Sequence, residues 1–337
     1  MGFLAFFASA FLALVLVGVV RSIALRAGIL DVPNSRSSHV AATPRGGGIA
    51  IVTITLAAAI LQFGVYNQHW IWLLTFLVGG GIVALAGFLD DLRGLPALGR
   101  ASSHMAAATL LVFAVGSLPT PPLPWLHIGH SSLGWIVPII AIVWSINLFN
   151  FMDGIDGLAA TQCAFVAGTG TVLCGTGDGL GEANLVQIAL SGSALGFLVW
   201  NFPRARIFLG DVGSGFIGFG IAAGTLFQTG RNPGNVWAWI ILNGLFISDA
   251  TVTILVRLVH GQRIYQAHRS HAYQRLARRW NSHQAVTLLF VAINVCWCLP
   301  WAAVSVHQPT AAPLWASIAL VPLIISAALM GAGRPDV

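Results

Sequence analysis

The 337-residue sequence contains no lysine and a single glutamate, and only 8% of its residues are charged. Soluble globular proteins carry about 25% charged residues, so this composition excludes a soluble globular domain. The glutamate, Glu182, is not part of a His-Glu-x-x-His pattern, which argues against an intramembrane zinc protease. The four cysteines fall inside apolar runs, where buried packing suits them better than a disulfide or a metal site.

Apolar sequence dominates what is present: 57% of the residues are hydrophobic and the mean hydropathy is +0.83. We therefore predict an all-α, polytopic integral membrane protein with one domain over residues 1–337 and about eleven spans of roughly 20 residues. The segment 104–118 is short, so ten spans are the alternative. The predicted spans are 3–25, 47–66, 69–89, 104–118, 133–150, 157–175, 185–202, 213–230, 236–257, 285–306 and 313–331.

The sixteen basic residues, all arginine, fall almost entirely on one side of this topology. With the N-terminus outside, fifteen lie in inner loops or helix ends and only Arg231 lies outside. The positive-inside rule then predicts an active face and a C-terminus in the cytoplasm. No basic residue precedes the run 3–25 and no convincing small-residue cleavage site follows it, so we expect a retained span rather than a signal peptide.

The segment 147–158, NLFNFMDGIDGL, places Asn150, Asp153 and Asp156 at the end of an apolar run. The two acids are three residues apart and share one face of a helical turn, and the adjoining glycines leave room for a ligand. Such carboxylates can hold a divalent cation or hydrogen-bond a sugar nucleotide. A polar helix cap is the alternative interpretation.

Two further acidic segments are expected on the inner face, FLDDLR at 88–93 and FLGDVGSG at 208–215. The adjacent carboxylates of Asp90 and Asp91 repel each other, which calls for a metal, an arginine or a shared proton. Neighbouring helical residues point about 100° apart, so the two acids should serve different partners. Asp211 stands at a helix start, where the dipole favours anions. An exposed acidic cap and ordinary N-capping are the respective alternatives.

Two inner loops are basic. Arg36, His39 and Arg45 lie in a Pro- and Gly-rich loop that precedes the second span, and His268, Arg269 and His271 lie in the longest inner loop, 258–284. Arginine and histidine donate hydrogen bonds to phosphate oxygens. Zinc binding and an anionic-lipid patch are the alternatives for the second loop.

Asp249, within the ninth predicted span, is a functional candidate because ionisable groups are costly in a bilayer; pairing with Arg257 is the alternative. The outer HxxH at His127 and His130 is interpreted as an interfacial turn. Acids, glycine-rich turns and Arg/His loops on one face are together typical of phosphate chemistry.

These blocks resemble the polytopic polyprenyl-phosphate N-acetylhexosamine-1-phosphate transferases, glycosyltransferase family 4, which includes phospho-N-acetylmuramoyl-pentapeptide transferase. The motif HRSHAYQ at 268–274 is most similar to the branch that initiates O-antigen and common-antigen lipopolysaccharide synthesis. The resemblance implies a bacterial inner-membrane enzyme that uses Mg²⁺, with Mn²⁺ as an alternative, and transfers HexNAc-1-phosphate from a UDP-N-acetyl sugar to undecaprenyl phosphate. It leaves open whether the protein forms a homodimer, and it implies no nucleic-acid partner.

The resemblance also implies roles for individual residues. Asp90, Asp91, His268 and His271 would be catalytic, Asp211 and Asp91 would hold the metal, and Asn150, Asp153, Asp156, Phe208, Arg45 and Arg269 would bind substrate. Family members often carry a lysine near the Asp pair or in the first inner loop, so an arginine must take that role here. The rival function is a polytopic transporter or lipid flippase, which would be expected to show internal repeats or paired midplane acids. The identity of the sugar is not encoded in any of these motifs.

Overall fold

The computed structural model describes residues 2–32, 42–66, 69–116, 132–175, 184–262 and 268–334, and most of these residues are helical. Arg36, His39, His127 and His130 lie outside the described residues. The elements are α1 (Gly2–Ala27), β1 (Leu30–Asp31), β2 (Thr43–Pro44), α2 (Gly48–Ala59) with the π-helix η1 (Ile60–Tyr66), α3 (Trp70–Arg93), α4 (Ala97–Val115), α5 (Ser132–Phe151), α6 (Leu158–Cys174), α7 (Leu185–Asn201), α8 (Asp211–Arg231), α9 (Asn235–Leu242), α10 (Gly244–Val259), α11 (Ala272–Trp280), α12 (His283–Ile293) with the π-helix η3 (Asn294–Cys298), α13 (Leu299–His307), the 3-10 turn η4 (Pro309–Ala311) and α14 (Ala312–Leu329).

The all-α prediction is confirmed for the described residues, in which the strands are one antiparallel pair of two residues each. Each of the eleven predicted segments coincides with a helix or with a run of consecutive helices. Among the described helices, six are long and apolar enough to cross a membrane, or seven if the bent pair α9 and α10 is one span. The protein is thus a multi-pass membrane protein, while eleven spans stay a prediction.

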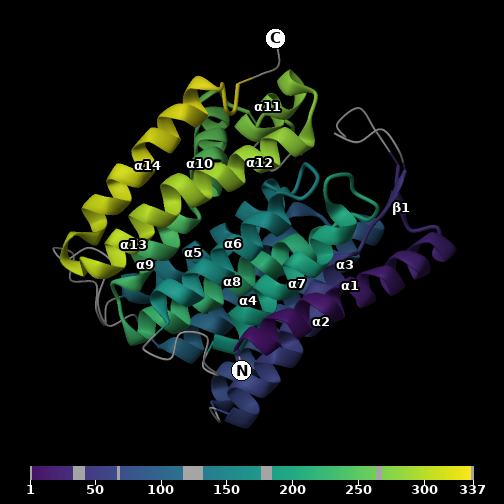
Figure 1. Cartoon of the computed structure of the whole chain (residues 1–337), viewed down its shortest axis with the longest axis horizontal. Coiled ribbons are helices and arrows are strands. Elements are labelled where there is room, and N and C mark those ends of the chain that lie inside the picture. Colours follow the sequence, from purple (N-terminus) through teal and green to yellow (C-terminus); the bar gives the residue numbers. More distant parts are fainter. Residues whose placement is uncertain are drawn as a thin grey trace.

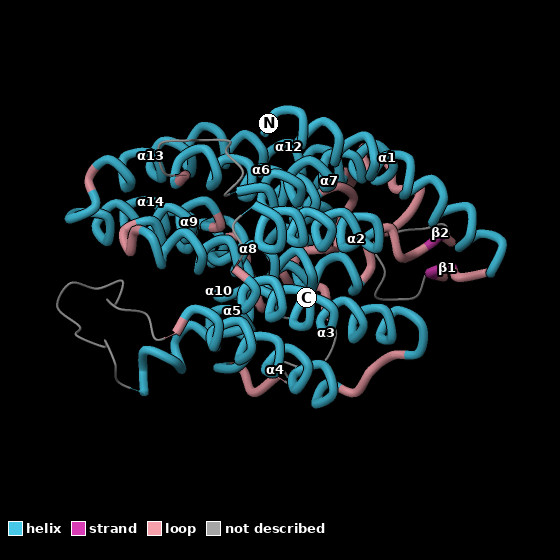
Figure 2. The backbone as a smooth tube through the Cα atoms, turned by 90° about the horizontal axis from the view of Figure 1, so that it is seen from below, coloured by secondary structure: helices cyan, strands magenta, loops and turns pink. Residues whose placement is uncertain are grey.

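Helix α8 is the centre of the bundle, with contacts to α2, α3, α4, α5, α6, α7 and α9. In Figure 2, α8 lies between α1, α6 and α7 on one side and α4 on the other. Glycines permit this crowding, because a side chain on Gly218 would collide with the backbone of Ser145 in α5. The Ser145 hydroxyl instead donates a hydrogen bond of 2.8 Å to the Gly218 carbonyl.

Two predicted segments differ from the structure in shape. The segment 236–257 is not one straight helix, because α9 and α10 meet at 70° around Asn243. The Asn243 side chain bonds back to the Trp239 carbonyl, and Gly244 lets Leu320 of α14 approach closely. The helix predicted over 104–118 begins seven residues earlier in the structure, because α4 starts at Ala97, directly after Pro96.

The acid-bearing ends of the helices meet on one side of the bundle. The C-terminal ends of α3 and α5, the first turn of α8 and the short helix α11 converge there, and β1 and α11 lie toward the same side of the molecule (Figure 1). Apolar side chains on the outside of the bundle, including Phe7 and Phe11 of α1 at 64% and 65% exposure, are suited to lipid contact.

Candidate active site

Two cavities open at the converging helix ends, and Gln274 of α11 lines both. We call the first the acidic cavity; its volume is about 770 Å³ and its polar lining includes Asp90, Arg100, His104, Asn147, Asn150, Asp153, Asp211, His268, His271 and Tyr273. We call the second the basic cavity; its volume is about 730 Å³ and its lining includes Asp156, Phe202, Arg204, Arg206, Arg269, Arg278 and His283.

Asp90 and Asp91 end α3 with different partners, as predicted. Asp90 lines the acidic cavity, and its carboxylate accepts hydrogen bonds from the Leu95 amide and from Arg100, the latter at 2.7 Å. The Asp91 carboxylate accepts from the Asp211 and Val212 amides at 3.0 and 3.2 Å. Asp91 therefore occupies the positive end of α8, and its predicted catalytic and metal roles stay predictions.

Asp211 is held at the start of α8 by contacts from α3 and α5. Asn150 donates to its carboxylate at 2.8 Å, and the Asp90 carboxyl group shares a side-chain hydrogen bond with it. Two carboxyl groups so close require a shared proton or a bound cation. Gly210 precedes Asp211 with φ of 77°, and a side chain there would press on the Asp91 carboxylate. The glycine is thus needed for both its conformation and its small size.

The loop between α5 and α6 directs its two acids into different cavities. Asp153 lines the acidic cavity, where burial, then the negative charges of Asp211 and Asp91, hold its pKa well above the usual range. Asp156 lines the basic cavity, where its carboxylate lies 3.5 Å from the His283 ring. The turn is fixed by Gly157, which has φ of 77° and donates its amide to Asn201 at 2.7 Å.

His268 and His271 lie at the start of α11 with their rings stacked at 5.0 Å, and both line the acidic cavity. Burial, and then the neighbouring His271 and Arg257, lower the pKa of His268 to about 4. His271 bonds to Asp249 at 3.2 Å. Among the described residues no set of three or more His, Cys, Asp or Glu side chains could hold a metal ion, which gives no support to the zinc alternative.

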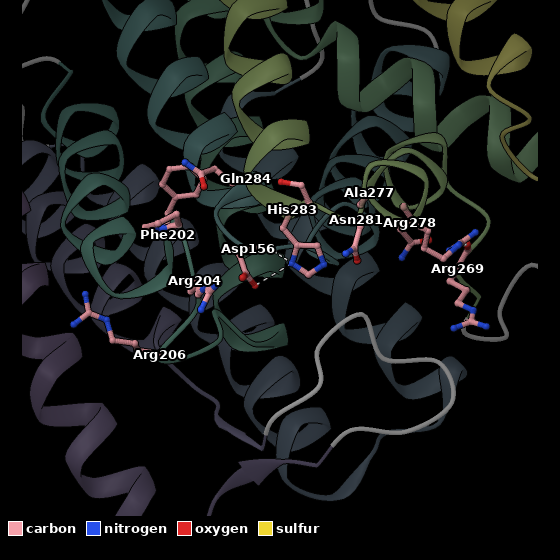
Figure 3. Close-up of a pocket in the computed structure, with 13 residues that line it drawn as sticks. Asp156, Phe202, Arg204, Arg206, Arg269, Ala277, Arg278, Asn281, His283 and Gln284 are labelled. Carbon is pink, nitrogen blue, oxygen red and sulfur yellow. Dashed lines mark hydrogen bonds and ion pairs between the residues drawn. The ribbon is translucent and has the colours of Figure 1, made fainter.

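Of the remaining predicted residues, Arg45 and Phe208 line neither cavity. Arg45 bridges Asp31 at 2.6 Å and Asp91 at 3.7 Å. The backbone of Phe208 pairs with Pro44 and Gly47, so this residue docks the first inner loop onto the segment before α8. Arg269 lines the basic cavity. In Figure 3, Arg204 and Arg206 lie on one side of the central Asp156 and His283, and Arg269 and Arg278 lie on the other.

Comparison with known proteins supports a single family. The model of glycosyl transferase family 4 matches residues 73–228. The chain is 29% identical over 326 residues to the probable undecaprenyl-phosphate N-acetylglucosaminyl 1-phosphate transferase of Bacillus subtilis (strain 168), covering 95% of this chain and 88% of that protein. It is 31% identical over 316 residues to the decaprenyl-phosphate N-acetylglucosaminephosphotransferase of Mycolicibacterium smegmatis, covering 82% of this chain and 76% of the relative.

A third relative is the phospho-N-acetylmuramoyl-pentapeptide-transferase of a Synechococcus strain, 31% identical over 268 residues, with 74% of this chain and 72% of the relative covered. The chain belongs to glycosyl transferase family 4. The resemblance of the sequence motifs to this family is thereby confirmed. The family match runs from α3 to α8 and so includes Asp90, Asn150, Asp153 and Asp211, which line the acidic cavity of this family 4 protein.

Several residues of the candidate site were not singled out from the sequence. Arg100 and His104 line the acidic cavity from α4, and Tyr273 and Gln274 line it from α11. Arg100 counted only toward membrane orientation, because the predicted span began after it. The placement of α4 beside Asp90 depends on tertiary packing, and the one available signal was an arginine ten residues after an acid.

Proposed function

We propose that this protein transfers a HexNAc-1-phosphate from a UDP-N-acetyl sugar to a polyprenyl phosphate, giving a polyprenyl-diphosphate sugar and UMP. One observation carries the proposal: the acidic cavity combines carboxylates and histidines with an apolar wall. That wall includes Leu98, Met105, Ile140, Val143, Trp144 and Ile254. A polar reaction centre next to an apolar surface suits a substrate with a phosphate head and a hydrocarbon chain. The names of the family 4 relatives support the same reaction.

The basic cavity suits the donor nucleotide. Arg204, Arg206, Arg269 and Arg278 supply guanidinium donors for diphosphate oxygens, and Asp156 supplies an acceptor for a nucleoside N–H or hydroxyl. Gln274 lies between this cavity and the acidic cavity. A donor seated across it would bring its sugar-bearing phosphate beside Asp90 and Asp211.

The acceptor phosphate would enter from the apolar wall. Asp90 is the preferred carboxylate to orient or deprotonate it, and Arg100, paired with Asp90 at 2.7 Å, is placed to share the phosphate charge. An acceptor oxygen then attacks the β-phosphorus of the UDP-sugar, the bond from that phosphorus to the bridging oxygen breaks, and UMP leaves. His271 and His268 would hydrogen-bond the donor phosphates during this exchange.

The carboxylates fit a magnesium site. Mg²⁺ is usually held by one or two carboxylates together with substrate phosphates and water, and the hydrogen-bonded Asp90 and Asp211 side chains provide such a pair. We propose Asp211 as the main ligand, with Asp91 behind it at the α8 amides. When bound, Mg²⁺ would neutralise charge on the donor diphosphate.

We further propose that the protein resides in a bacterial inner membrane with its N-terminus periplasmic and its C-terminus cytoplasmic. The bias of the arginines supports this orientation. The lipid product would start a cell-surface polysaccharide, with O-antigen as the branch suggested by HRSHAYQ. N-acetylglucosamine is the first sugar to test, because it stands in the relatives' names.

The test is UMP release by purified protein. We expect release only when UDP-N-acetylglucosamine or another UDP-N-acetyl sugar, polyprenyl phosphate and Mg²⁺ are all present. Chelation with EDTA should abolish release, and added Mg²⁺ should restore it. A protein that moves polyprenyl lipids between leaflets of a vesicle but releases no UMP from any of these donors would support the flippase alternative and refute the proposal.

A further inference from the structure

Asp249 is a buried acid in α10. Its carboxylate receives hydrogen bonds from the first residues of the neighbouring helix α11. Asp249 is 3% exposed, and its carboxylate accepts from the Ala272 and Tyr273 amides at 2.9 and 2.8 Å. The Thr253 hydroxyl donates to it at 3.2 Å, and His271 bonds to it through Nδ1, also at 3.2 Å. Asp249 does not line the acidic cavity, whereas His271 does.

We infer that Asp249 is a positioning residue that fixes the ring of His271 in the active site; the inference rests on the proposed function. An ionised carboxylate only accepts hydrogen bonds, so Nδ1 of His271 must carry the proton of their shared bond. Nε2 is then the nitrogen left for the cavity. Stacking against His268 at 5.0 Å and a ring contact with Phe151 at 6.1 Å restrict rotation of the imidazole.

The same carboxylate fixes where α11 begins. The first amides of a helix lack partners within the helix, and Asp249 supplies acceptors for two of them. The position of the His271 backbone and the orientation of its ring therefore depend on one buried group in a neighbouring helix. A role confined to capping would not require the bond to the ring.

Asp249→Asn separates these roles. The carboxamide keeps one acceptor oxygen for an α11 amide, but its NH₂ group turned toward His271 would force the proton from Nδ1 to Nε2. For histidines that bind metal ions, loss of such an outer partner lowers metal affinity or activity by roughly 10- to 100-fold, and we take this as the scale for His271. We expect a loss of kcat on that scale, with KM for polyprenyl phosphate changed by less than roughly twofold because His271 is proposed to contact the donor phosphates rather than the acceptor.

The kinetic test is a double-mutant cycle. If Asp249 acts through His271, Asp249→Asn should cost less than roughly twofold in a protein that already carries His271→Ala. An equal loss in both backgrounds would overturn the inference. The matched control is Ser248→Ala, since the buried Ser248 hydroxyl has no hydrogen-bond partner within the described part of the chain. This control should behave as wild type in both backgrounds.

A second measurement needs neither turnover nor a stable D249N protein. With ¹⁵N-labelled histidine, the NMR signals of His271 are those that disappear in H271A. In the wild type these signals should report a ring protonated at Nδ1. Thr253→Val should broaden or shift them, because the Thr253 hydroxyl donates a hydrogen bond to Asp249. A wild-type ring protonated only at Nε2 would refute the inference even if the enzyme is active. A ring protonated at Nδ1 in a protein without UMP release would refute the proposed function alone.

Discussion

Asp211 interacts with side chains from two other helices, α3 and α5, although it lies in a single helical turn at the start of α8. Asn150 of α5 donates to its carboxylate, the Asp90 carboxyl group of α3 shares a hydrogen bond with it, and its own amide donates to Asp91. The amide contact depends only on the backbone and the Asn150 contact only on an acceptor oxygen, whereas the proposed binding of Mg²⁺ depends on the charge. The two can therefore be separated by substitution.

Asp211→Asn should leave the protein folded and inserted yet lower turnover by roughly two to four orders of magnitude, the scale of a few kcal/mol of transition-state stabilisation. The carboxamide oxygen can still accept from Asn150, so the melting temperature in detergent should not fall. Initial rates measured across a Mg²⁺ titration check this prediction. If Mg²⁺ stimulates mutant and wild type to the same degree, Asp211 is only a helix cap.

His268 links stability to pH. Burial lowers its pKa to about 4 from 6.5, so between these values the unfolded chain binds a proton that the folded chain does not. Stability contributed by neutral His268 is therefore present above pH 6.5 and is lost as the pH falls toward 4. We expect His268→Gln to reduce the drop in melting temperature between roughly pH 7 and pH 5. His260→Gln, at an exposed histidine, is the control and should keep the wild-type drop.

At the scale of the helices, the site depends on the approach of α2 and α3 to the first turn of α8. A side chain on Gly48 would collide with the Cα atom of Gly213, and one on Gly87 would collide with the Asp211 backbone. These contacts set the position of the α8 amides that hold Asp91. Small residues in three helices therefore determine where the carboxylates lie.

Gly48→Ala should destabilise the protein by about 1–3 kcal/mol, the usual cost of overpacking, and should also reduce activity because α8 moves. Gly81→Ala in α3 is the matched control, since a side chain there would meet nothing within 4 Å. The measurement is the thermal melting of both variants in the same detergent. Equal melting of the two variants would show that the α2–α8 contact is not what fixes this region.

Much of this arrangement could be predicted from the sequence, and the reasons are physical. Asp90, Asn150, Asp153 and Asp211 stand out because acids and amides beside apolar runs are rare, and all four line the acidic cavity. The separation of Asp153 from Asp156 could not be predicted. It depends on the turn at Gly157 and on the place of α12, which brings His283 to Asp156. The bend at Asn243 also arises from packing, against α14.

At the scale of the whole molecule, the proposed orientation places all site loops on the cytoplasmic side of the membrane. A cysteine that tests this orientation must be accessible to the reagent. Ser270, within the HRSHAYQ motif, is only 6% exposed and is therefore unsuitable. Arg279 in α11 and Asn232 after α8 are both exposed, and the predicted topology places them on opposite sides of the membrane.

In a cysteine-free background, Arg279→Cys should resist a membrane-impermeant thiol reagent in intact cells, whereas Asn232→Cys should react with it. Permeabilised cells provide the accessibility control, since both sites should then be labelled. Labelling of the cysteine at position 279 alone in intact cells would show that the orientation is the opposite of the proposed one.

The central claim is that a phosphate moves together with the sugar. UDP-N-acetylglucosamine labelled with ³²P at the β-phosphate distinguishes this reaction from simple sugar transfer, which would leave the label in UDP. With purified protein, polyprenyl phosphate and Mg²⁺, we predict that the label enters the lipid fraction while unlabelled UMP accumulates, and that D211N shows neither change. Label recovered in UDP, with sugar but no ³²P in the lipid, would contradict the account.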